Sequence, residues 1–311
     1  MICRVKPAWR PQLRLSLISD KGDGRQPGNG FRAVVLTALL LVLGGCSLRL
    51  TYGFLDWWLL WQVEDYLTLN HGQQQQLEQS LKQFHQWHRQ HELPRYAALA
   101  EEAAQLMAAP RISPEQLQQI EAQAVELWQA SLERLLPAGT QLLVSLSNDQ
   151  LGELAESLAD ARAEFAKDYV EPPANERLHS RRQRLEETLE SLLGDLTPAQ
   201  QQQLAVTVSR LQESAALARA HREQEHGRFL KLLERRQQPG FAVELASFVR
   251  DHDARRPPQL QQAYDHNGAL VQQLVVELHA SLSPSQRQHL NRYLLDHQEI
   301  FLELARASAH R

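Results

Sequence analysis

Apolar residues recur at helical spacing along most of the chain after position 46. Leu204, Val208, Leu211 and Ala215 follow one another at intervals of four, three and four residues, and polar residues fill most positions between them. Such spacing places the apolar side chains on one stripe of a helix. The chain is also rich in Leu, Ala, Gln, Glu and Arg, which favour helices, and no stretch alternates as a strand would. We therefore predict an all-α fold.

Prolines and glycines fall between the periodic segments and set the ends of the predicted helices. We expect breaks at residues 109–110, 137–139, 172–173, 239–240 and 257–258. Helices joined by such short loops should pack as an antiparallel helical bundle or a curved helical array. The predicted helices cover residues 50–69, 72–108 (bent near Pro94), 114–136, 148–170, 175–193, 198–236, 241–254, 258–281 and 284–308.

A pattern that occurs five times marks helix starts. An apolar residue is followed by Ser, Thr or Asn, then by Gln three positions later and by Leu or Ile four positions after that. The small polar side chain can accept a hydrogen bond from an N–H of the first turn, and the Gln can bond the N–H of the cap. Uneven intervals between the motifs argue against a regular solenoid. The predicted pairs are Asn70 and Gln73, Ser113 and Gln116, Ser147 and Gln150, Thr197 and Gln200, and Ser283 and Gln286.

One apolar segment near the N-terminus differs from the rest. Residues 33–43 form a run of apolar side chains, interrupted only by Thr37, that follows Arg32 and ends in Gly44-Gly45-Cys46. A positive residue, a short apolar core and small residues are typical of a secretory signal, and this ending resembles a bacterial lipobox. The run is shorter than the roughly 20 residues that cross a bilayer, which argues against an uncleaved anchor. We expect residues 1–45 to be a signal peptide, with a natural start later than Met1.

The resemblance to a lipobox implies a lipid anchor. In such lipoproteins the Cys receives diacylglycerol, the chain is cut before it, and the new amine is acylated. Cys46 would then carry the lipid, and residues 46–311 would form a single all-helical periplasmic domain. Two acyl chains anchor a protein stably where one binds only marginally. Ser47, rather than Asp, follows the Cys, and resemblance to known lipoprotein sorting implies the periplasmic face of the outer membrane rather than the inner membrane.

The charge of the mature chain argues against a nucleic-acid partner. The full sequence has a formal net charge of −4, and without residues 1–45 it retains 26 Lys and Arg against 35 Asp and Glu, a net charge of −9. An acidic body is repelled by phosphate backbones and by anionic membrane surfaces. Because Cys3 would be removed and Cys46 lipidated, we expect no disulfide, and roughly 265 residues can bury a sufficient core without one.

Residues 52–96 have the most distinctive composition. Three of the six tryptophans fall within residues 57–61, and the segment resembles a family of proteobacterial lipoproteins of unknown function. Members share Asp-Trp-x-Leu-x-Trp and Trp-His-Arg-x-x-Glu-Leu-Pro-x-Tyr stretches, and Asn70 stands here in place of their usual hydroxyl cap. The resemblance implies an all-helical lipoprotein and no particular activity. The matching residues are Asp56, Trp57, Trp61, Asp65, Tyr66, Leu69, Gln73, Trp87, His88, Arg89, Glu92, Leu93, Pro94 and Tyr96.

The tryptophan-bearing helix has two interpretations. It follows closely behind the lipid anchor, and Trp favours the membrane interface. A helix that is apolar all round is more often buried, which is the interpretation that we favour. A short loop at residues 70–72 should make the first two helices antiparallel neighbours. We expect Arg89 to meet Asp56 there in an ion pair that the Trp rings shield from water.

The side chains of His88 and Glu92 should share a helix face. A polar network that fixes helix register is the plainer use for them, and a ligand site is the alternative. Their types and spacing would also suit zinc, but the mature chain offers no cysteine ligand and no His-Glu-x-x-His motif, so we expect no metal and no cofactor besides the lipid. His221 with Glu225, and residues 252–253, offer no better pattern.

No sequence motif points to catalysis, because a nucleophile elbow, a phosphate-binding loop and a triad signature are all missing. We therefore expect no enzyme, but a lipid-anchored envelope protein with a binding or scaffold role and a periplasmic or envelope protein as partner. Residues 196–200, Leu-Thr-Pro-Ala-Gln, resemble the LTxxQ motif of small helical periplasmic stress chaperones. A chaperone-like role is thus the first alternative, and an enzyme that uses the His88 region is the second.

Overall fold

The computed structural model describes residues 48–49 and 52–307. Almost all of them are helical and none lies in a strand, which confirms the predicted all-α fold. A π-helical turn, η1 (His88–Glu92), joins α4 to α5, and a 3-10 turn, η2 (Asp253–Arg255), follows α11. The α-helices are α3 (Leu55–Glu64), α4 (His71–Trp87), α5 (Leu93–Ala108), α6 (Pro114–Ser145), α7 (Asn148–Tyr169), α8 (Ala174–Leu193), α9 (Pro198–Arg210), α10 (Ala215–Leu233), α11 (Phe241–Arg250), α12 (Pro258–Ala280) and α13 (Pro284–Arg306).

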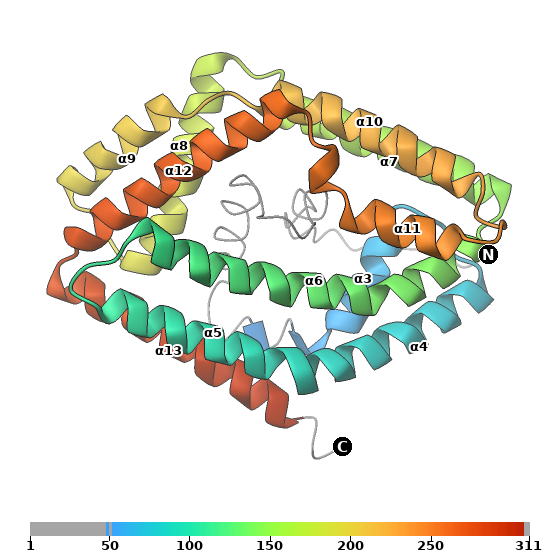
Figure 1. The fold of residues 1–311 in the computed structure, drawn as a ribbon, viewed down its shortest axis with the longest axis horizontal. Helices are drawn as coiled ribbons and strands as arrows, with labels where there is room; N and C mark the ends of the chain where they lie inside the picture. Colours follow the sequence, from blue (N-terminus) through green and yellow to red (C-terminus); the bar gives the residue numbers. More distant parts are fainter. Residues whose placement is uncertain (1–47, 50–51, 308–311) are drawn as a thin grey trace, which may run out of the picture.

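The helices form a curved array that closes into a flattened ring (Figure 1). Along one edge α5 and α13 pack together and run antiparallel. Leu93 shares an apolar cluster with Ile300 at one end, and Met107 packs against the cluster that contains Leu290 at the other. Helices α8, α9 and α12 form one side, and α7, α10 and α11 form the opposite side. The long helix α6 crosses between them and contacts α4, α5, α11 and α12. The structure is thus a curved helical array, one of the two arrangements that the sequence left open.

Two large apolar cores hold the two sides of the ring. One joins α3, α4, α6, α7, α10 and α11 and contains Leu233, and the other joins α8, α9, α12 and α13 and contains Leu204. Both leucines have an exposed fraction of 0%. Burial of one such side chain stabilises the fold by about 1.5–3 kcal/mol, so the cores outweigh any single polar contact.

All five predicted capping boxes form. In each, the cap side chain accepts a hydrogen bond from the Gln N–H, and the Gln side chain accepts one from the N–H of the cap. Four of these glutamines also pair with one another. The side-chain amides of Gln73 and Gln150 each donate to the other's Oε1, at 3.1 and 2.7 Å, and those of Gln200 and Gln286 do the same at 3.1 and 2.9 Å. We call these pairs the glutamine clasps.

The two clasps have matching surroundings, because each of the four glutamines also donates to a backbone carbonyl near the end of another helix. Gln73 and Gln200 occupy equivalent positions 127 residues apart, and so do the residues that accept from Gln150 and Gln286. Gln150 and Gln286 are 136 residues apart, and so are the residues that accept from Gln73 and Gln200. One local arrangement therefore occurs twice. The donations are Gln73 to Ser145 (3.0 Å) and Gln150 to Thr68 (2.8 Å) in the first clasp, and Gln200 to Ser281 (3.4 Å) and Gln286 to Asp195 (2.9 Å) in the second.

The helix end predicted at residues 137–139 is wrong, because α6 continues through Pro137 to Ser145. A proline inside a helix removes one hydrogen bond and crowds the preceding turn, which costs about 3 kcal/mol. Beyond the proline, Leu142 and Leu146 are buried in the first core. Burial of these two side chains offsets that cost, so packing extends the helix where local preference would end it.

The single helix predicted over residues 198–236 is wrong too, since α9 ends at Arg210 and α10 begins at Ala215. Neither Gly nor Pro marks this break. Asn267 of α12 stabilises it, because its Oδ1 accepts from the Gln212 N–H at 2.7 Å and its Nδ2 donates to the Gln212 carbonyl at 3.0 Å. A contact from another helix thus satisfies the backbone groups that a continuous helix would pair internally.

Helices α3 and α11 are shorter than predicted. Helix α3 ends at Glu64, inside the predicted range 50–69. Residues 67–70 belong to no helix, and Asn70, whose backbone is extended, caps α4. Helix α11 ends at Arg250, before the 3-10 turn. Within the described part of the chain, no helix is both long enough and apolar enough to cross a membrane.

Candidate functional site

The most unusual local structure is the π-helical turn between α4 and α5. In this turn the Leu93 N–H bonds to the carbonyl of His88, five residues back. Pro94 follows and has no N–H to continue a regular ladder. The bend expected near Pro94 is thus a π-helical turn at His88–Glu92, two to six residues before the proline. Single π turns are frequent at functional sites, so the side chains around this turn are the first candidates.

His88 forms a neutral hydrogen-bonded pair with Tyr52. Tyr52 Oη lies 2.7 Å from His88 Nδ1, and the rings of Phe84 and Tyr96 pack at centroid distances of 5.6 and 5.8 Å from the imidazole. Burial, and then the neighbouring His85, lowers the pKa of His88 to about 4. Burial also raises the pKa of Tyr52 far above its usual value. Both groups are therefore uncharged at neutral pH, and their bond joins the start of the described chain to the π turn.

The direct ion pair predicted between Arg89 and Asp56 does not form, because His85 lies between them. His85 Nδ1 is 3.4 Å from Asp56 Oδ1, and Arg89 Nε donates to His85 Nε2 at 3.1 Å. Burial and the charge of Arg89 lower the pKa of His85, against the opposing effect of Asp56. A neutral imidazole can donate from Nδ1 while accepting at Nε2, so one ring connects both charged groups. We call Tyr52, His85, His88 and Arg89 the aromatic–histidine cluster.

Trp57 is not buried, so the favoured interpretation of the first helix is wrong for this residue. Trp57 is 62% exposed and Phe54 is 63% exposed, whereas Trp58 and Trp61 are partly buried. Helix α3 packs mainly against α4 and buries Leu60 in the first core. Trp57 lies on the face of α3 that these contacts leave uncovered.

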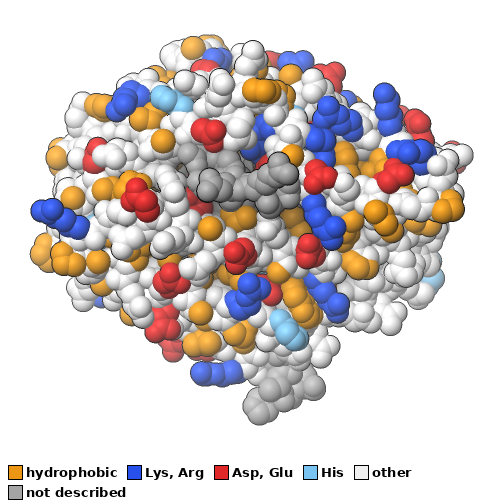
Figure 2. Space-filling model, viewed as in Figure 1, with side chains coloured by type: hydrophobic (Ala, Val, Ile, Leu, Met, Phe, Trp, Pro, Cys, Tyr) orange, Lys and Arg blue, Asp and Glu red, His pale blue; other side chains and the backbone are white. Residues whose placement is uncertain are grey.

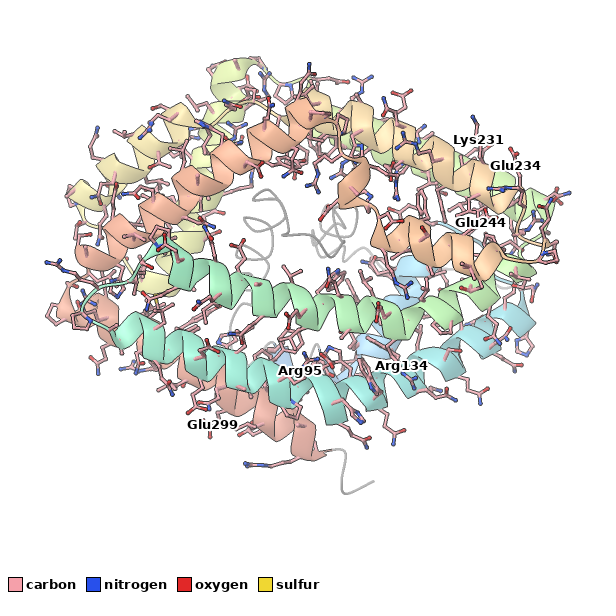
Figure 3. All side chains as sticks on the ribbon, in the orientation of Figure 1. Arg95, Arg134, Lys231, Glu234, Glu244 and Glu299 are labelled. Carbon is pink, nitrogen blue, oxygen red and sulfur yellow. The ribbon has the colours of Figure 1, made fainter. Side chains whose placement is uncertain are left out.

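Three further residues of the motif, Trp87, Glu92 and Pro94, lie in or beside the π turn. Trp87 is half-buried, and the guanidinium of Arg134 lies 5.7 Å from its ring centroid; Figure 3 shows Arg134 reaching from α6 towards α4. Glu92 is 2% exposed and accepts from Arg95 Nη1 at 3.0 and 3.1 Å. Pro94 is exposed. Glu92 and His88 thus have different hydrogen-bond partners, Arg95 for the carboxylate and Tyr52 for the imidazole.

A second buried polar cluster, which the sequence reasoning missed, joins α10 to η2. Glu225 is 5% exposed, accepts from Arg255 at 2.7 Å and from Arg228 at 2.6 Å, and lies 3.3 Å from His252 Nδ1. Burial by itself raises the pKa of Glu225, but these three partners outweigh it and hold the pKa well below its usual value. The spacing of His221 and Glu225 suggested at most a weak metal site. Two arginines satisfy the carboxylate instead.

The described residues contain no group of three or more His, Cys, Asp or Glu side chains placed to hold a metal ion. The side chains visible in Figure 2 mix acidic and basic types over the whole face, with small hydrophobic groups between them. This mixture is typical of a solvated helical surface.

An open groove of about 620 Å³ lies between α6 and α11. Its walls are mostly apolar, and Pro137 cannot donate to the carbonyl of Glu133, which therefore lacks its usual helical partner. Glu133 and Arg250 form an exposed ion pair at the groove, with 3.4 Å between Oε1 and Nε. The groove thus combines apolar area, a backbone acceptor and charges of both signs. Its lining residues are Glu133, Leu136, Pro137, Thr140, Gln141, Val144, Ala242 and Arg250.

Comparison with known protein families finds one match, over residues 65–261, to a group described as "Family of unknown function (DUF6279)". The matched region begins just after α3 and includes the π turn, both helices of the groove and the Glu225 cluster. No curated protein and no solved structure matches the chain.

Proposed function

The chain belongs to the DUF6279 family of unknown function, and we propose that it is a lipid-anchored envelope protein that binds a helix of a partner protein in the α6–α11 groove. It would reside on the periplasmic face of the outer membrane, need no cofactor besides its lipid, and act as a binding or scaffold protein rather than an enzyme.

The lipid anchor is supported by the sequence around Cys46, which lies outside the described residues. The apolar run, the two glycines and the Cys resemble a lipobox. The stretches that begin at Asp56 and Trp87 resemble those of proteobacterial lipoproteins. Ser47 supports the outer membrane over the inner one, by resemblance to known lipoprotein sorting.

The binding role is carried by the α6–α11 groove. The groove has a volume of about 620 Å³, mostly apolar walls and a few polar groups at its rim. It is open and runs between two helices, which suits an amphipathic helix laid along it by its apolar face. Glu133 and Arg250 would orient such a helix, because each can exchange its present exposed partner for a complementary charge.

The proposed site can be tested by photo-crosslinking in cells. A photoreactive residue at Thr140 should form an adduct with one envelope protein. Ala242→Trp places an indole in the groove and should abolish the adduct, and Ala242 is exposed, so the larger side chain can be accommodated. Val206→Trp on α9, at a residue 47% exposed and away from the groove, is the matched control and should leave the adduct unchanged. An adduct that survives Ala242→Trp, or no protein adduct at all, contradicts the proposed site.

The geometry gives less support to the two alternatives, a chaperone-like role and an enzyme that uses the His88 region. In the LTxxQ-like stretch, Gln200 is 1% exposed and its side chain is engaged by Thr197 and Gln286, so the stretch serves as a helix cap and offers little surface to a client protein. The His88 ring is partly buried, its Nδ1 is engaged by Tyr52, and the rings of Phe84 and Tyr96 pack around it.

A further inference from the structure

Phe54 and Trp57 form an exposed aromatic patch at the start of α3. We infer that this patch inserts into the interface of a phospholipid bilayer, so that the domain is seated directly on the membrane in one orientation. The inference rests on the proposed lipid anchor at Cys46 and adds to it a second membrane contact.

The geometry places both rings on one side of the helix. The Trp58 N–H bonds to the Phe54 carbonyl at 2.8 Å, so the helical turn includes residue 54, and residues three apart then share a face. Phe54 is 63% exposed and Trp57 is 62% exposed. Two large aromatic side chains that find no cover within the described chain suit the membrane interface, where Trp in particular is enriched.

The chain beside the anchor is fixed to the body of the domain. Arg49 Nε lies 2.8 Å from Glu303 Oε2 near the end of α13, and Leu48 and Leu55 pack into one apolar cluster with that helix. Cys46 precedes Leu48 by two residues, and covalent geometry limits two residues to about 7 Å. An acylated Cys46 therefore holds this corner of the domain at the membrane surface, beside the aromatic patch.

The charges on α3 indicate which end faces water. Glu64 and Asp65, at the C-terminal end of the helix, are exposed. With a rise of 1.5 Å per residue, Glu64 lies about 10 Å further along the helix axis than Trp57. The aromatic end can thus reach the headgroup region while the acidic end remains in solution.

The aromatic–histidine cluster fixes the segment that carries the aromatic patch to the rest of the domain. Tyr52 is bonded to His88 and Asp56 to His85, so the residues on either side of Phe54 are both tied to α4 and the π turn. Insertion of the patch would then orient the whole array, because the segment that carries it cannot pivot freely.

A single-cysteine experiment tests the inference on the lipidated protein. With Cys3 removed and Cys46 acylated, Trp57→Cys supplies the one free thiol, and Phe54→Cys supplies a second position on the patch. The matched control is Val243→Cys, at a residue 74% exposed on α11. Each protein is expressed from its full precursor, purified from membranes, labelled with the fluorophore NBD and reconstituted into phosphatidylethanolamine–phosphatidylglycerol vesicles. We expect NBD emission to be blue-shifted at positions 57 and 54 and to be quenched there when the vesicles contain doxyl-labelled phospholipid. Neither the shift nor the quenching is expected at position 243.

Flotation of the same vesicles separates the two claims. If the proteins float with the vesicles but NBD emission at positions 57 and 54 is like that at position 243, insertion of the aromatic patch is contradicted and the lipid anchor is not. If the wild-type protein does not float, both the lipid anchor and the insertion of the patch are contradicted.

Discussion

Gln200 and Gln286 exchange two side-chain hydrogen bonds, of 3.1 and 2.9 Å, although 86 residues separate them in the chain. Each also caps the first turn of its own helix, so one amide both starts a helix and joins it to another. The Gln73–Gln150 clasp repeats this arrangement on the other side of the ring. A glutamine used in this way leaves several polar groups unsatisfied when it is removed.

Replacement of Gln200 by Ala should therefore destabilise the fold by about 3 kcal/mol, since the amide of Gln286 and the N–H of Thr197 lose buried partners. Urea unfolding followed by circular dichroism measures this loss. Gln202→Ala, at an exposed position of the same helix, is the control and should change the free energy of unfolding by less than about 0.5 kcal/mol. Equal effects of the two substitutions would contradict a structural clasp.

His85→Ala should lower the free energy of unfolding by about 2 kcal/mol, because it removes the ring that joins Asp56 to Arg89. Asp56→Asn should lose less, and the double variant should lose less than the sum of the two single losses. Simple additivity of the two substitutions would mean that His85 and Asp56 do not interact. His91→Gln, at an exposed position in the π turn, serves as the control.

Stability should fall as the pH drops from about 6.5 to 4. The pKa of His88 is lowered to about 4 in the fold, so the unfolded chain takes up its proton first and the folded state loses stability through this range. At 1.36 kcal/mol per pKa unit, the loss from His88 is roughly 3 kcal/mol. His226, whose pKa burial and Arg162 also lower to about 4, adds in the same direction.

The pH effect of His88 can be isolated with His88→Gln, which cannot titrate. The loss of stability between pH 6.5 and 4 should be smaller in this variant than in the wild type, whereas exposed His71→Gln should keep the wild-type loss. Urea midpoints at several pH values give the comparison. An unchanged pH profile in His88→Gln would show that the ring is not held neutral by the fold.

Asn267→Ala should destabilise the break between α9 and α10 by about 2 kcal/mol, since it removes both bonds to the backbone of Gln212. Hydrogen exchange should speed up at residues 211–214 in particular. Gln262→Ala, exposed on the same helix, should change neither quantity. Unaltered exchange in Asn267→Ala would mean that the break has another cause.

The features that the sequence predicted well depend on local signals. Each of the five caps needs only two side chains three residues apart, and the start of α13 is further marked by Pro284 at its first position. Features decided by distant contacts were mispredicted. Pro137 lies inside α6 because residues beyond it pack in a core, and residues 211–214 leave the helix because Asn267 bonds to them.

Prediction of the candidate site was limited in the same way. The segment that carries Asp56, His88 and Arg89 was identified from its residue types, and the structure brings these residues near one another. The intervening role of His85 depends on where α3 crosses α4, which spacing along each helix does not reveal. The exposure of Trp57 was missed because an apolar composition does not show which faces of a helix its neighbours cover.

The most direct test of the central claim, a lipid anchor at Cys46, is the intact mass of the protein extracted from the membranes of its native host. The expected mass is that of residues 46–311 with a diacylglyceryl group on the thiol and an acyl group on the new amine. Cys46→Ala should remain an unprocessed precursor that takes up no labelled palmitate. A wild-type mass that retains residues before Cys46, or that shows no lipid on it, would contradict the claim.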